Sequence, residues 1–425
     1  MTFNLSSILT KLHNSSYFIN QPNLKRTGSV HFYFTITSKK PGFLNITPYI
    51  DLPPPPPKSS SPKSSAKQQT ILVTGGGGLA GTNIITHLLK DKSLASINII
   101  GLDLFLPRGS RNIVDKRVEF IASDLCSASD NSLIDLLVTN NVIGIIHTAG
   151  LVWMKDDPAS LFNVNTFATS KMLHCARSAK TVKGFIITSS ASVINNGKED
   201  RILMSPELVP AGPFESHYAE SKANAEISVI SSNHENFKTI SLRLPGVYGL
   251  DDPWLFGPLV KRAMPPLPAV PAKKVEMVYV ENVAVAHVEA IKTLIFSSDK
   301  IAKKASGRTY NITNCEPDIS MGELLDISYD VFPQKSEKPQ YLNLTLSYFI
   351  TIFVEVTYWF CSGSVPKPFD PFWNFTRNSL GYMTHDGTFS TAGNEDIGYK
   401  PLFTTRLSVL RIKHLVDERE KAKNK

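Results

Sequence analysis

Tyr218 and Lys222 have the side-chain types and the spacing of an acid–base pair. They stand in Y-A-E-S-K within the run 216–230, which we expect to be helical, so a separation of four residues puts both on one face, one turn apart. A free tyrosine has a pKa of about 10 and is a poor base at neutral pH. Nearby positive charge favours the phenolate and lowers that pKa, so Tyr218 would then accept the proton of an alcohol.

A serine cluster, S-S-A-S at 189–192, follows a strand expected at 184–188. One of its hydroxyls is placed to hold the same alcohol oxygen. Alone, a Y-x-x-x-K pattern often arises by chance on surface helices. The catalytic interpretation therefore depends on a cofactor site elsewhere in the chain and on a fold that brings these segments together.

The stretch 70–81, T-I-L-V-T-G-G-G-G-L-A-G, predicts that cofactor site. A short buried strand at 71–73 runs into a glycine turn, and a helix is expected at 82–90. Gly75, Gly78 and Gly81 have a spacing that lets backbone N–H groups and a helix N-terminus approach a pyrophosphate. A glycine-rich loop also serves as a plain flexible turn. The strand–turn–helix context is what predicts a dinucleotide.

Asp103 is expected to select the dinucleotide. It ends a second strand at 96–102, about twenty residues beyond the last glycine, where a carboxylate accepts hydrogen bonds from ribose hydroxyls. The same charge repels a ribose phosphate, so NAD is favoured over NADP. Arg108 and Arg111 follow closely and would soften that preference.

Asp124 and Leu125 follow a third strand at 118–121 and are expected to reach the adenine. Tyr218 and Lys222 are expected to touch the cofactor at its nicotinamide end. A hydride leaving the substrate would pass to that ring as Tyr218 takes the proton.

Strand and helix patterns alternate from residue 70 onward, as a doubly wound parallel sheet requires. Further helices are expected at 130–139 and 158–179, and a fourth strand at 144–147. We predict an α/β chain whose parts are a disordered leader at 1–69, a Rossmann-type NAD-binding domain at 70–250 to which 275–313 returns, and a smaller substrate-binding region at 251–274 and 314–425.

His147 closes the fourth strand beside the turn T-A-G. A histidine at such a position is more often structural than catalytic, so we predict a structural role.

Charge and cysteine usage exclude several classes of function. The chain has 425 residues and a net charge of +8, but residues 1–69 carry +7 of it and the remainder only +1. A basic tail without a basic face makes nucleic acid an unfavoured partner. The four cysteines show no metal-ligand spacing, which indicates reduced thiols facing the cytosol and no structural metal site.

The leader is rich in Asn, Ser and Pro and ends in P-P-P-P-P-K-S-S-S-P-K-S-S. Such a composition buries too little apolar surface to offset the entropy of ordering. Its first ten residues lack the basic start and long apolar core of a signal peptide, and a transit peptide remains open because acidic residues are nearly absent.

The motifs together resemble the extended short-chain dehydrogenase/reductase superfamily, and within it the 3β-hydroxysteroid dehydrogenase group, most of all the sterol-4α-carboxylate 3-dehydrogenases (decarboxylating). The resemblance covers about residues 70–410. It rests on T-G-G-G-G-L-A-G (74–81), I-I-H-T-A (145–149), N-V-N (163–165), T-S-S-A-S-V (188–193), Y-A-E-S-K (218–222), R-L-P-G-V-Y-G (243–249), Y-V-E-N-V-A-V-A-H (279–287), N-I-T-N-C-E-P (311–317) and G-Y-K-P-L (398–402).

This resemblance implies that the catalytic serine, tyrosine and lysine fall on Ser190, Tyr218 and Lys222. The implied reaction is NAD-dependent oxidation of a sterol 3β-hydroxyl. With a 4α-carboxylate on the substrate, the resulting β-keto acid loses carbon dioxide without a further protein acid. The proline-rich segment 260–274 departs from the relatives, which carry a glycine-and-asparagine turn there. That loop borders substrate in the superfamily, so the departure concerns substrate identity.

A hydrophobic helix is expected at 342–360, where 13 of 19 residues are apolar or aromatic. Its length approaches that of a bilayer core, but Asn343, Ser347 and Glu355 count against a spanning helix. An interfacial helix is favoured, and a buried amphipathic helix stays open. The resemblance implies attachment to the endoplasmic reticulum membrane with the catalytic domain facing the cytosol, and a sterol arriving from the bilayer. The sequence does not give the oligomeric state, and a homodimer is one of the partners that stay open.

Other functions remain open. A 3β-hydroxy-Δ5-steroid dehydrogenase with isomerase activity is closely related. Nucleotide-sugar epimerisation uses the same three residues, although the late hydrophobic helix argues against it. A non-enzymatic NAD-sensing protein on this fold has no need of the Tyr218–Lys222 pair.

Overall fold

The computed structural model describes residues 32–37, 45–50, 68–107, 112–152, 157–253, 255–260, 267–268, 272–317, 319–333, 341–360 and 376–423. Three predictions concern residues outside these ranges: the role of Arg108 and Arg111, most of the proline-rich segment 260–274, and Cys361. The chain divides into two units, Met1–Lys63 and Ser64–Lys425.

In the first unit the structure describes one antiparallel pair of strands, β1 (Phe32–Thr37) and β2 (Asn45–Ile50). The prediction of a disordered leader otherwise concerns residues 1–31, 38–44 and 51–67, which lie outside the described residues.

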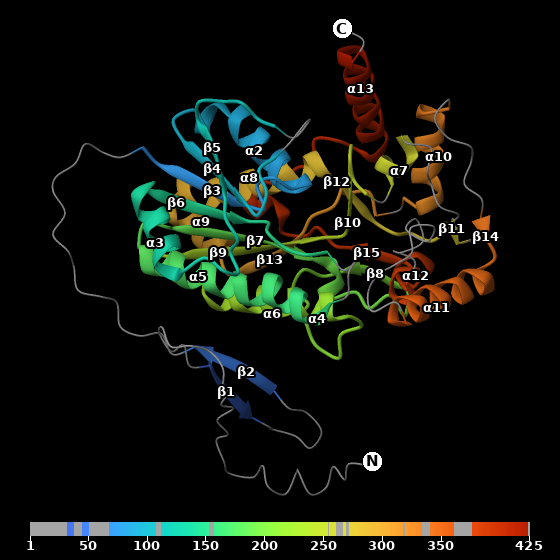
Figure 1. The fold of residues 1–425 in the computed structure, drawn as a ribbon, viewed down its shortest axis with the longest axis horizontal. Helices are drawn as coiled ribbons and strands as arrows, with labels where there is room; N and C mark the ends of the chain where they lie inside the picture. Colours follow the sequence, from blue (N-terminus) through green and yellow to red (C-terminus); the bar gives the residue numbers. More distant parts are fainter. Residues whose placement is uncertain are drawn as a thin grey trace, which may run out of the picture. The chain divides into compact units, whose positions relative to one another are not determined.

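The second unit is built on a seven-stranded sheet with the order β13-β9-β7-β6-β3-β4-β5 (Figure 1), and every pairing in it is parallel. This confirms the doubly wound sheet. The strands are β3 (Thr70–Thr74), β4 (Asn98–Asp103), β5 (Val118–Ala122), β6 (Val142–His147), β7 (Gly184–Ser190), β9 (Lys238–Leu244) and β13 (Arg308–Asn311).

Helices cover both faces of this sheet, because its central strands are apolar on both sides. One face packs against α2 (Leu79–Lys90) and α8 (Val280–Phe296), and the other against α3 (Asp130–Thr139), α5 (Ala168–Ala179) and α6 (His217–Ser231). β3 is buried throughout.

The helix expected at 158–179 is interrupted. The structure divides it into α4 (Pro158–Leu161), a π-helical segment (Phe162–Phe167) and α5. Asn165 lies in the π-helical segment, where its side chain bonds to groups outside the helix. Such insertions mark functional sites in many proteins.

The segment 275–313 returns to the sheet in part. β13 pairs with β9 and α8 packs on the sheet, while β12 (Met277–Tyr279) pairs with β10 (Gly246–Tyr248) outside it. A separate apolar cluster joins α7 (Phe256–Val260), α10 (Met321–Val331) and α13 (Thr405–Lys423).

The remaining elements are β8 (Arg201–Met204), which pairs with β15 (Gly387–Phe389), β11 (Leu267–Pro268), which pairs with β14 (Tyr341–Leu342), and the helices α9 (Asp299–Ala305), α11 (Leu344–Phe360) and α12 (Arg377–Thr384). Single 3-10 turns occupy Lys92–Leu94, Ala191–Val193 and Asn394–Ile397. Within the described residues, no helix is long and apolar enough to cross a membrane.

Candidate active site

The glycine loop lies where the order of the sheet reverses. The chain runs from β3 outward through β4 to β5, then crosses back to β6 on the other side of β3. Ligands of doubly wound sheets bind in the crevice outside the carboxyl ends of the strands at such a point. Gly75 to Gly78 join β3 to α2 at this end.

Two of the three glycines, Gly75 and Gly81, have no room for a side chain. Gly75 has a φ of +70°, and a Cβ on it would lie 2.7 Å from the backbone nitrogen of Ala149, just after β6. A Cβ on Gly81 would lie 2.1 Å from the carbonyl oxygen of Gly75. The loop and the first turn of α2 therefore pack backbone against backbone, which no larger residue permits.

The N-terminus of α2 is suited to an anion. Gly78 is its N-cap and supplies no side-chain hydrogen bond to the first turn, which contains no acidic residue. The first N–H groups of a helix have no partner within the helix and carry the positive end of its dipole. A pyrophosphate is the group that these features fit.

Asp103 is the last residue of β4 and lies against the loop. Its Oδ2 accepts a hydrogen bond of 2.9 Å from the Gly77 N–H. A Cβ on Gly77 would lie 3.3 Å from the same oxygen. The carboxylate thus lies beside the glycine turn, and its contact with the ribose stays a prediction.

Asp124 and Leu125 follow β5 at the same edge of the sheet. The Asp124 carboxylate accepts a hydrogen bond of 2.9 Å from the Cys126 N–H. Hydrogen bonds from Cys126 and Ser127 hold its pKa below the usual range. The Lys171 ammonium on α5 donates to the carbonyl oxygen of Leu125 at 3.0 Å, which ties the turn after β5 to α5. Adenine contact by this turn stays a prediction.

His147 has the contacts of a structural residue. It is fully buried at the end of β6, its Nδ1 lies 2.7 Å from the Thr74 hydroxyl, and its Nε2 lies 2.9 Å from the Thr169 hydroxyl. Burial, and secondarily the charge of Lys222, lower its pKa to about 3. With both ring nitrogens engaged and the ring neutral, it supports β6 and has no free nitrogen for catalysis.

Ser190 and Tyr218 are in contact. β7 runs two residues beyond its expected end at 188, so Ser190 is its last residue, and the Ser190 hydroxyl is close enough to the Tyr218 phenol on α6 to favour the phenolate. Its neighbour Ser189 is buried on the opposite face of the strand. Ser192 donates its N–H to the Ser190 oxygen at 3.2 Å. Strand alternation therefore makes Ser190 the serine that meets Tyr218.

In the protein without a cofactor, the pKa of Tyr218 is raised, so a lowered value in the presence of the nicotinamide ring stays a prediction. Burial raises the pKa of Tyr218, and only the hydrogen bond from Ser190 opposes it. The Lys222 ammonium instead donates to the carbonyl oxygen of Thr188 on β7 at 2.7 Å. Burial lowers the pKa of Lys222 to about 8, although the Glu226 carboxylate opposes that shift.

Asn165 is a site residue whose role the sequence analysis missed. Its amide nitrogen donates to the Ser221 hydroxyl at 3.0 Å and to the Leu151 carbonyl at 3.1 Å, and its oxygen accepts the Leu151 N–H at 2.8 Å. A Cβ on Gly150 would lie 3.1 Å from that oxygen and 3.5 Å from the Lys222 nitrogen. Asn165 thus fixes the strand-end loop beside Lys222. The N-V-N motif was the available signal.

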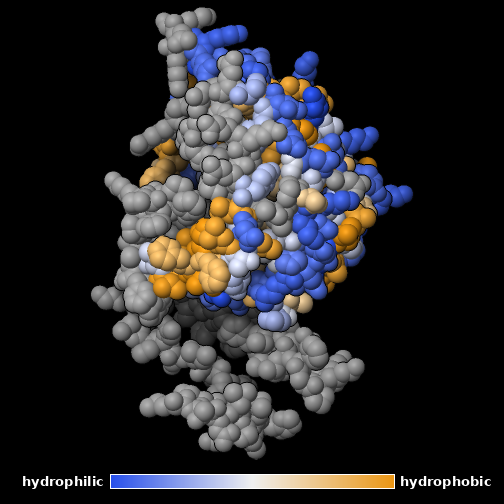
Figure 2. Space-filling model, turned by 90° about the vertical axis from the view of Figure 1, so that its right-hand side faces the viewer, coloured by the Kyte–Doolittle hydropathy of each residue, from blue (hydrophilic) through white to orange (hydrophobic). Residues whose placement is uncertain are grey.

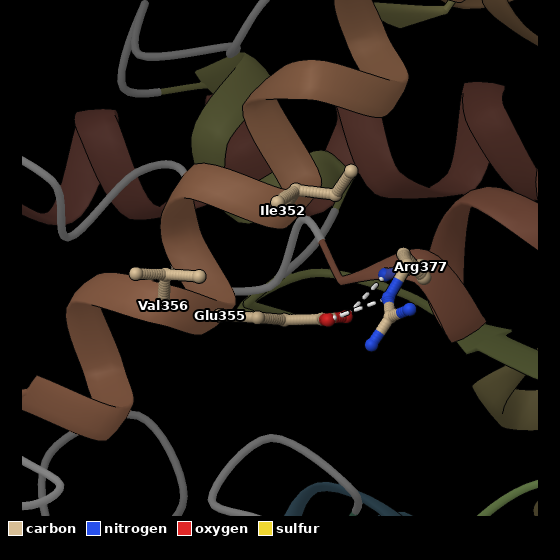
Figure 3. Close-up of a pocket in the computed structure, with 4 residues that line it drawn as sticks. All are labelled: Ile352, Glu355, Val356 and Arg377. Atoms are coloured by element: carbon tan, nitrogen blue, oxygen red, sulfur yellow. Dashed lines mark hydrogen bonds and ion pairs between the residues drawn. The ribbon is translucent and has the colours of Figure 1, made fainter.

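The described cysteines and the surface hollow are not part of the catalytic group. Cys126, Cys175 and Cys315 are free thiols, and burial raises the pKa of Cys175 to about 12. No three His, Cys, Asp or Glu side chains among the described residues are grouped as metal ligands. A surface hollow between α11 and α12 is lined by Ile352, Glu355, Val356 and Arg377 (Figure 3) and includes none of the catalytic candidates.

A model of the 3-beta hydroxysteroid dehydrogenase/isomerase family matches residues 72–339. The chain belongs to this family. It is an oxidoreductase of the extended short-chain dehydrogenase/reductase type that depends on a nicotinamide dinucleotide. The glycine loop, Ser190 and Tyr218 all lie within the matched segment.

Its relatives carry two kinds of name. Sterol-4-alpha-carboxylate 3-dehydrogenase, decarboxylating, of Gibberella zeae is 26% identical over 273 residues, which are 61% of this chain and 86% of the relative. The Bos taurus protein of that name is 31% identical over 209 residues, 47% of this chain and about half (55%) of the relative. A 2-alkyl-3-oxoalkanoate reductase of Shewanella oneidensis is 26% identical over 283 residues, 63% of this chain and 69% of the relative.

Solved structures support the fold. A UDP-glucose 4-epimerase of Thermotoga maritima with UDP-glucose has a TM-score of 0.62 at 14% identity. A UDP-glucuronic acid 4-epimerase of Bacillus cereus in complex with NAD has a TM-score of 0.60 at 17% identity. Each match covers 82% of this chain and 99% of the other. At these identities the likeness concerns the arrangement of the sheet and its helices.

Proposed function

We propose that the protein oxidises the 3β-hydroxyl of a sterol that carries a 4α-carboxylate, with NAD as the acceptor. The observation that carries this proposal is the Ser190–Tyr218 contact at the carboxyl end of β7, in the same unit as a glycine loop suited to a pyrophosphate. Ser190 holds the substrate oxygen, and Tyr218 accepts its proton.

The chemistry balances with these two residues. The Tyr218 phenolate accepts the O–H proton while the C3–H bond breaks. A bound oxidised nicotinamide would supply the acceptor for the hydride and a positive charge that favours the phenolate. Lys222, beside Gly150 and anchored on Thr188, would contact the nicotinamide ribose of a bound cofactor. The ketone so formed is a β-keto acid. Cleavage of its C4–carboxylate bond releases carbon dioxide, and the bonding electrons remain as an enolate that takes up a proton at C4.

The two kinds of relative support a single substrate chemistry. A 4α-carboxysterol has a hydroxyl on the carbon next to the one that bears the carboxylate. The name 2-alkyl-3-oxoalkanoate likewise describes an oxo group next to a substituted carbon that bears a carboxylate. A β-hydroxy acid branched at the carbon between its two functional groups is therefore the substrate class that we propose, with the sterol acid as its first member.

NAD in place of NADP is part of the proposal. The Asp103 carboxylate lies against the phosphate-binding turn through Gly77, where its charge would repel a ribose phosphate.

The test of the reaction uses purified full-length protein. It is incubated with NAD and, separately, with a 4α-carboxysterol, a Δ5-3β-hydroxysteroid and a 2-alkyl-3-hydroxyalkanoate, and products are identified by mass spectrometry. We expect a 3-ketosterol one carbon dioxide lighter than the oxidised acid. Turnover of only the Δ5-steroid, with a shifted double bond, would replace the proposal by the dehydrogenase/isomerase reaction. Turnover of only the alkyl acid would keep the β-hydroxy acid class and remove the sterol.

We propose further that α11 lies on a membrane surface, that of the endoplasmic reticulum. Its exposed side chains are mostly apolar, among them Phe349 at 63% and Phe353 at 55% exposure. Figure 2 faces the side on which α11 lies in Figure 1 and contains a cluster of hydrophobic residues there. Burying such a surface is favourable by about 25 cal/mol per Å².

Fractionation tests the membrane proposal. Full-length protein should sediment with membranes, and Phe349→Lys with Phe353→Lys should release it. A matched control places lysines at Val114 and Leu402, which are also exposed but lie outside α11, and should stay bound. A wild-type protein found wholly in the soluble fraction contradicts the proposal.

A further inference from the structure

The turn that follows β5 is held by a single ammonium group. Lys171, half-buried on α5, donates to the carbonyl oxygens of three turn residues: Leu125 at 3.0 Å, Cys126 at 2.7 Å and Ala128 at 3.0 Å. An ammonium has three hydrogens, so these bonds use all of its donors. The hydrogen-bonding capacity of Lys171 is therefore directed entirely at the backbone of this turn.

The position of the turn explains why it needs this support. β5 is the last strand of the seven-stranded sheet and pairs with β4 alone. The outer side of an edge strand has no neighbouring strand to hold the turn that follows it. Two bonds close the turn internally: the Ala128 N–H donates to the Asp124 carbonyl at 2.8 Å, and the Cys126 N–H donates to the Asp124 carboxylate at 2.9 Å. Lys171 connects this closed turn to a packed helix.

The planarity of the peptide bond sets the direction in which the turn faces. In a trans peptide, the carbonyl oxygen and the N–H that follows it point to opposite sides. Lys171 holds the Leu125 carbonyl on the side of α5, and the N–H of the same peptide donates to the Asp124 carboxylate. The Asp124 carboxylate is thereby held on the side away from Lys171. This is the carboxylate that we expect to reach the adenine.

The helical run that carries Lys171 also reaches the catalytic end of the site. The π-helical segment and α5 are continuous from Phe162 to Ala179. Asn165 on the same run fixes the strand-end loop at Leu151. One helical element therefore supports the loop beside the catalytic lysine and the turn expected at the adenine.

We propose that Lys171 is a positioning residue for the adenine half of the cofactor site. It holds three carbonyl oxygens of the turn against α5, so that the Asp124 carboxylate is already directed at the base when a cofactor arrives. A binding surface that is ordered in advance loses less entropy on binding. The inference rests on the proposal that the cofactor is NAD, because it concerns the base that the turn recognises.

The test measures binding by calorimetry and needs no substrate. Adenine carries an amino group that donates to a carboxylate, whereas hypoxanthine carries an oxygen, an acceptor, at that position. We therefore compare the dissociation constants of NAD and of nicotinamide hypoxanthine dinucleotide, which differ only in the base. Wild type should bind NAD about tenfold more tightly or better, because the analogue leaves the carboxylate without its donor.

Lys171→Met removes the ammonium and keeps an unbranched side chain. It should weaken NAD binding about tenfold and lower the preference for NAD over the analogue to less than about threefold, because the Asp124 carboxylate is no longer held in place. Lys171→Gln keeps two N–H donors and should show a smaller loss of the same kind. If Lys171→Met does not fold, Lys171→Gln decides in its place.

Arg117→Met is the matched control. Arg117 is also half-buried, and its guanidinium donates to the carbonyl oxygens of Leu89 at 2.7 Å and Leu94 at 3.2 Å, at the opposite end of β5. This variant should lower the free energy of unfolding in urea, as Lys171→Met should, but keep the wild-type preference for NAD.

An unchanged base preference in the Lys171 variants overturns the inference. An equal loss of preference in Arg117→Met also overturns it, because the effect would then be one of general stability. Equal binding of the two dinucleotides by wild type overturns it as well, since the turn then does not recognise the base. A preference that depends on Lys171 supports the inference even if no sterol acid is oxidised. Wild-type protein that binds neither dinucleotide overturns the proposed cofactor, and the inference with it.

Discussion

Lys222→Met should make the protein without cofactor more stable at neutral pH while it abolishes turnover. Lys222 is 7% exposed, and burial lowers its pKa from 10.5 to about 8. In the unfolded chain the same amine titrates at its ordinary value. A shift of this size corresponds to about 3 kcal/mol against the folded state wherever the lysine is charged.

The sign follows from proton binding. Between pH 10.5 and 8 the unfolded chain holds more protons than the folded protein, so the lysine's contribution to stability falls as the pH falls through that window. Below pH 8 the full cost is present. The methionine removes it, but it also leaves the Thr188 carbonyl without the 2.7 Å hydrogen bond, a loss of about 1–3 kcal/mol. The net gain at pH 7 is then at most about 2 kcal/mol.

Urea unfolding of both proteins without NAD, from pH 7 to pH 10.5, measures the effect. The pH dependence is the sharper test, since the lost hydrogen bond contributes at every pH whereas the charge cost does not. As the pH rises from 7 to 10.5, the free energy of unfolding of wild type should increase by about 3 kcal/mol relative to that of the variant. A difference that stays constant with pH refutes the reasoning, because Lys222 would then be no harder to charge in the folded protein.

The other predictions concern the proton acceptor, the cofactor and the sheet. Tyr218→Phe should lower kcat by about 100- to 10,000-fold with NAD affinity unchanged, and turnover within tenfold of wild type contradicts its role. Asp103→Ala should raise the use of NADP relative to NAD; a wild-type enzyme that already prefers NADP shows that the carboxylate does not select the cofactor. Gly81→Ala should abolish NAD binding measured by calorimetry, because its Cβ would lie 2.1 Å from the Gly75 oxygen, and normal affinity would rule out this packing. His147, whose pKa of about 3 lies below its unfolded value, contributes stability that is lost as the pH falls from 6.5 toward 3, by about 1.4 kcal/mol per pH unit; His147→Gln should flatten the acid side of the stability curve, and an unchanged slope would mean that His147 charges freely.

Local sequence was sufficient for the elements of the sheet. The apolar run before the glycines, the aspartate that ends β4 and the four-residue spacing of Tyr218 and Lys222 are all set by residues close in the chain, where periodicity and turn chemistry act. The expected ends of these elements were off by a few residues. α2 begins at Leu79, where 82 was expected, because the helix already starts at the N-cap glycine of the loop.

The partners of the site residues came from distant parts of the chain. Lys222 donates to a carbonyl 34 residues earlier, and Asn165 binds a serine 56 residues later through a π-helical turn that no periodicity predicts. Each of these contacts depends on which strands are neighbours and on which helix faces them, and residue types alone do not contain that information.

The amino-acid sequence by itself was sufficient for the fold class, and it predicts the dinucleotide loop and the acid–base residues, because each of these depends on residues that are close together in the chain. Only the tertiary structure decided their electrostatic states. Burial under packed helices raises the pKa of Tyr218, whereas the sequence predicts a lowered value beside positive charge. Burial also lowers the pKa of Lys222. Desolvation depends on everything that surrounds a side chain, so it exists only once the chain has folded.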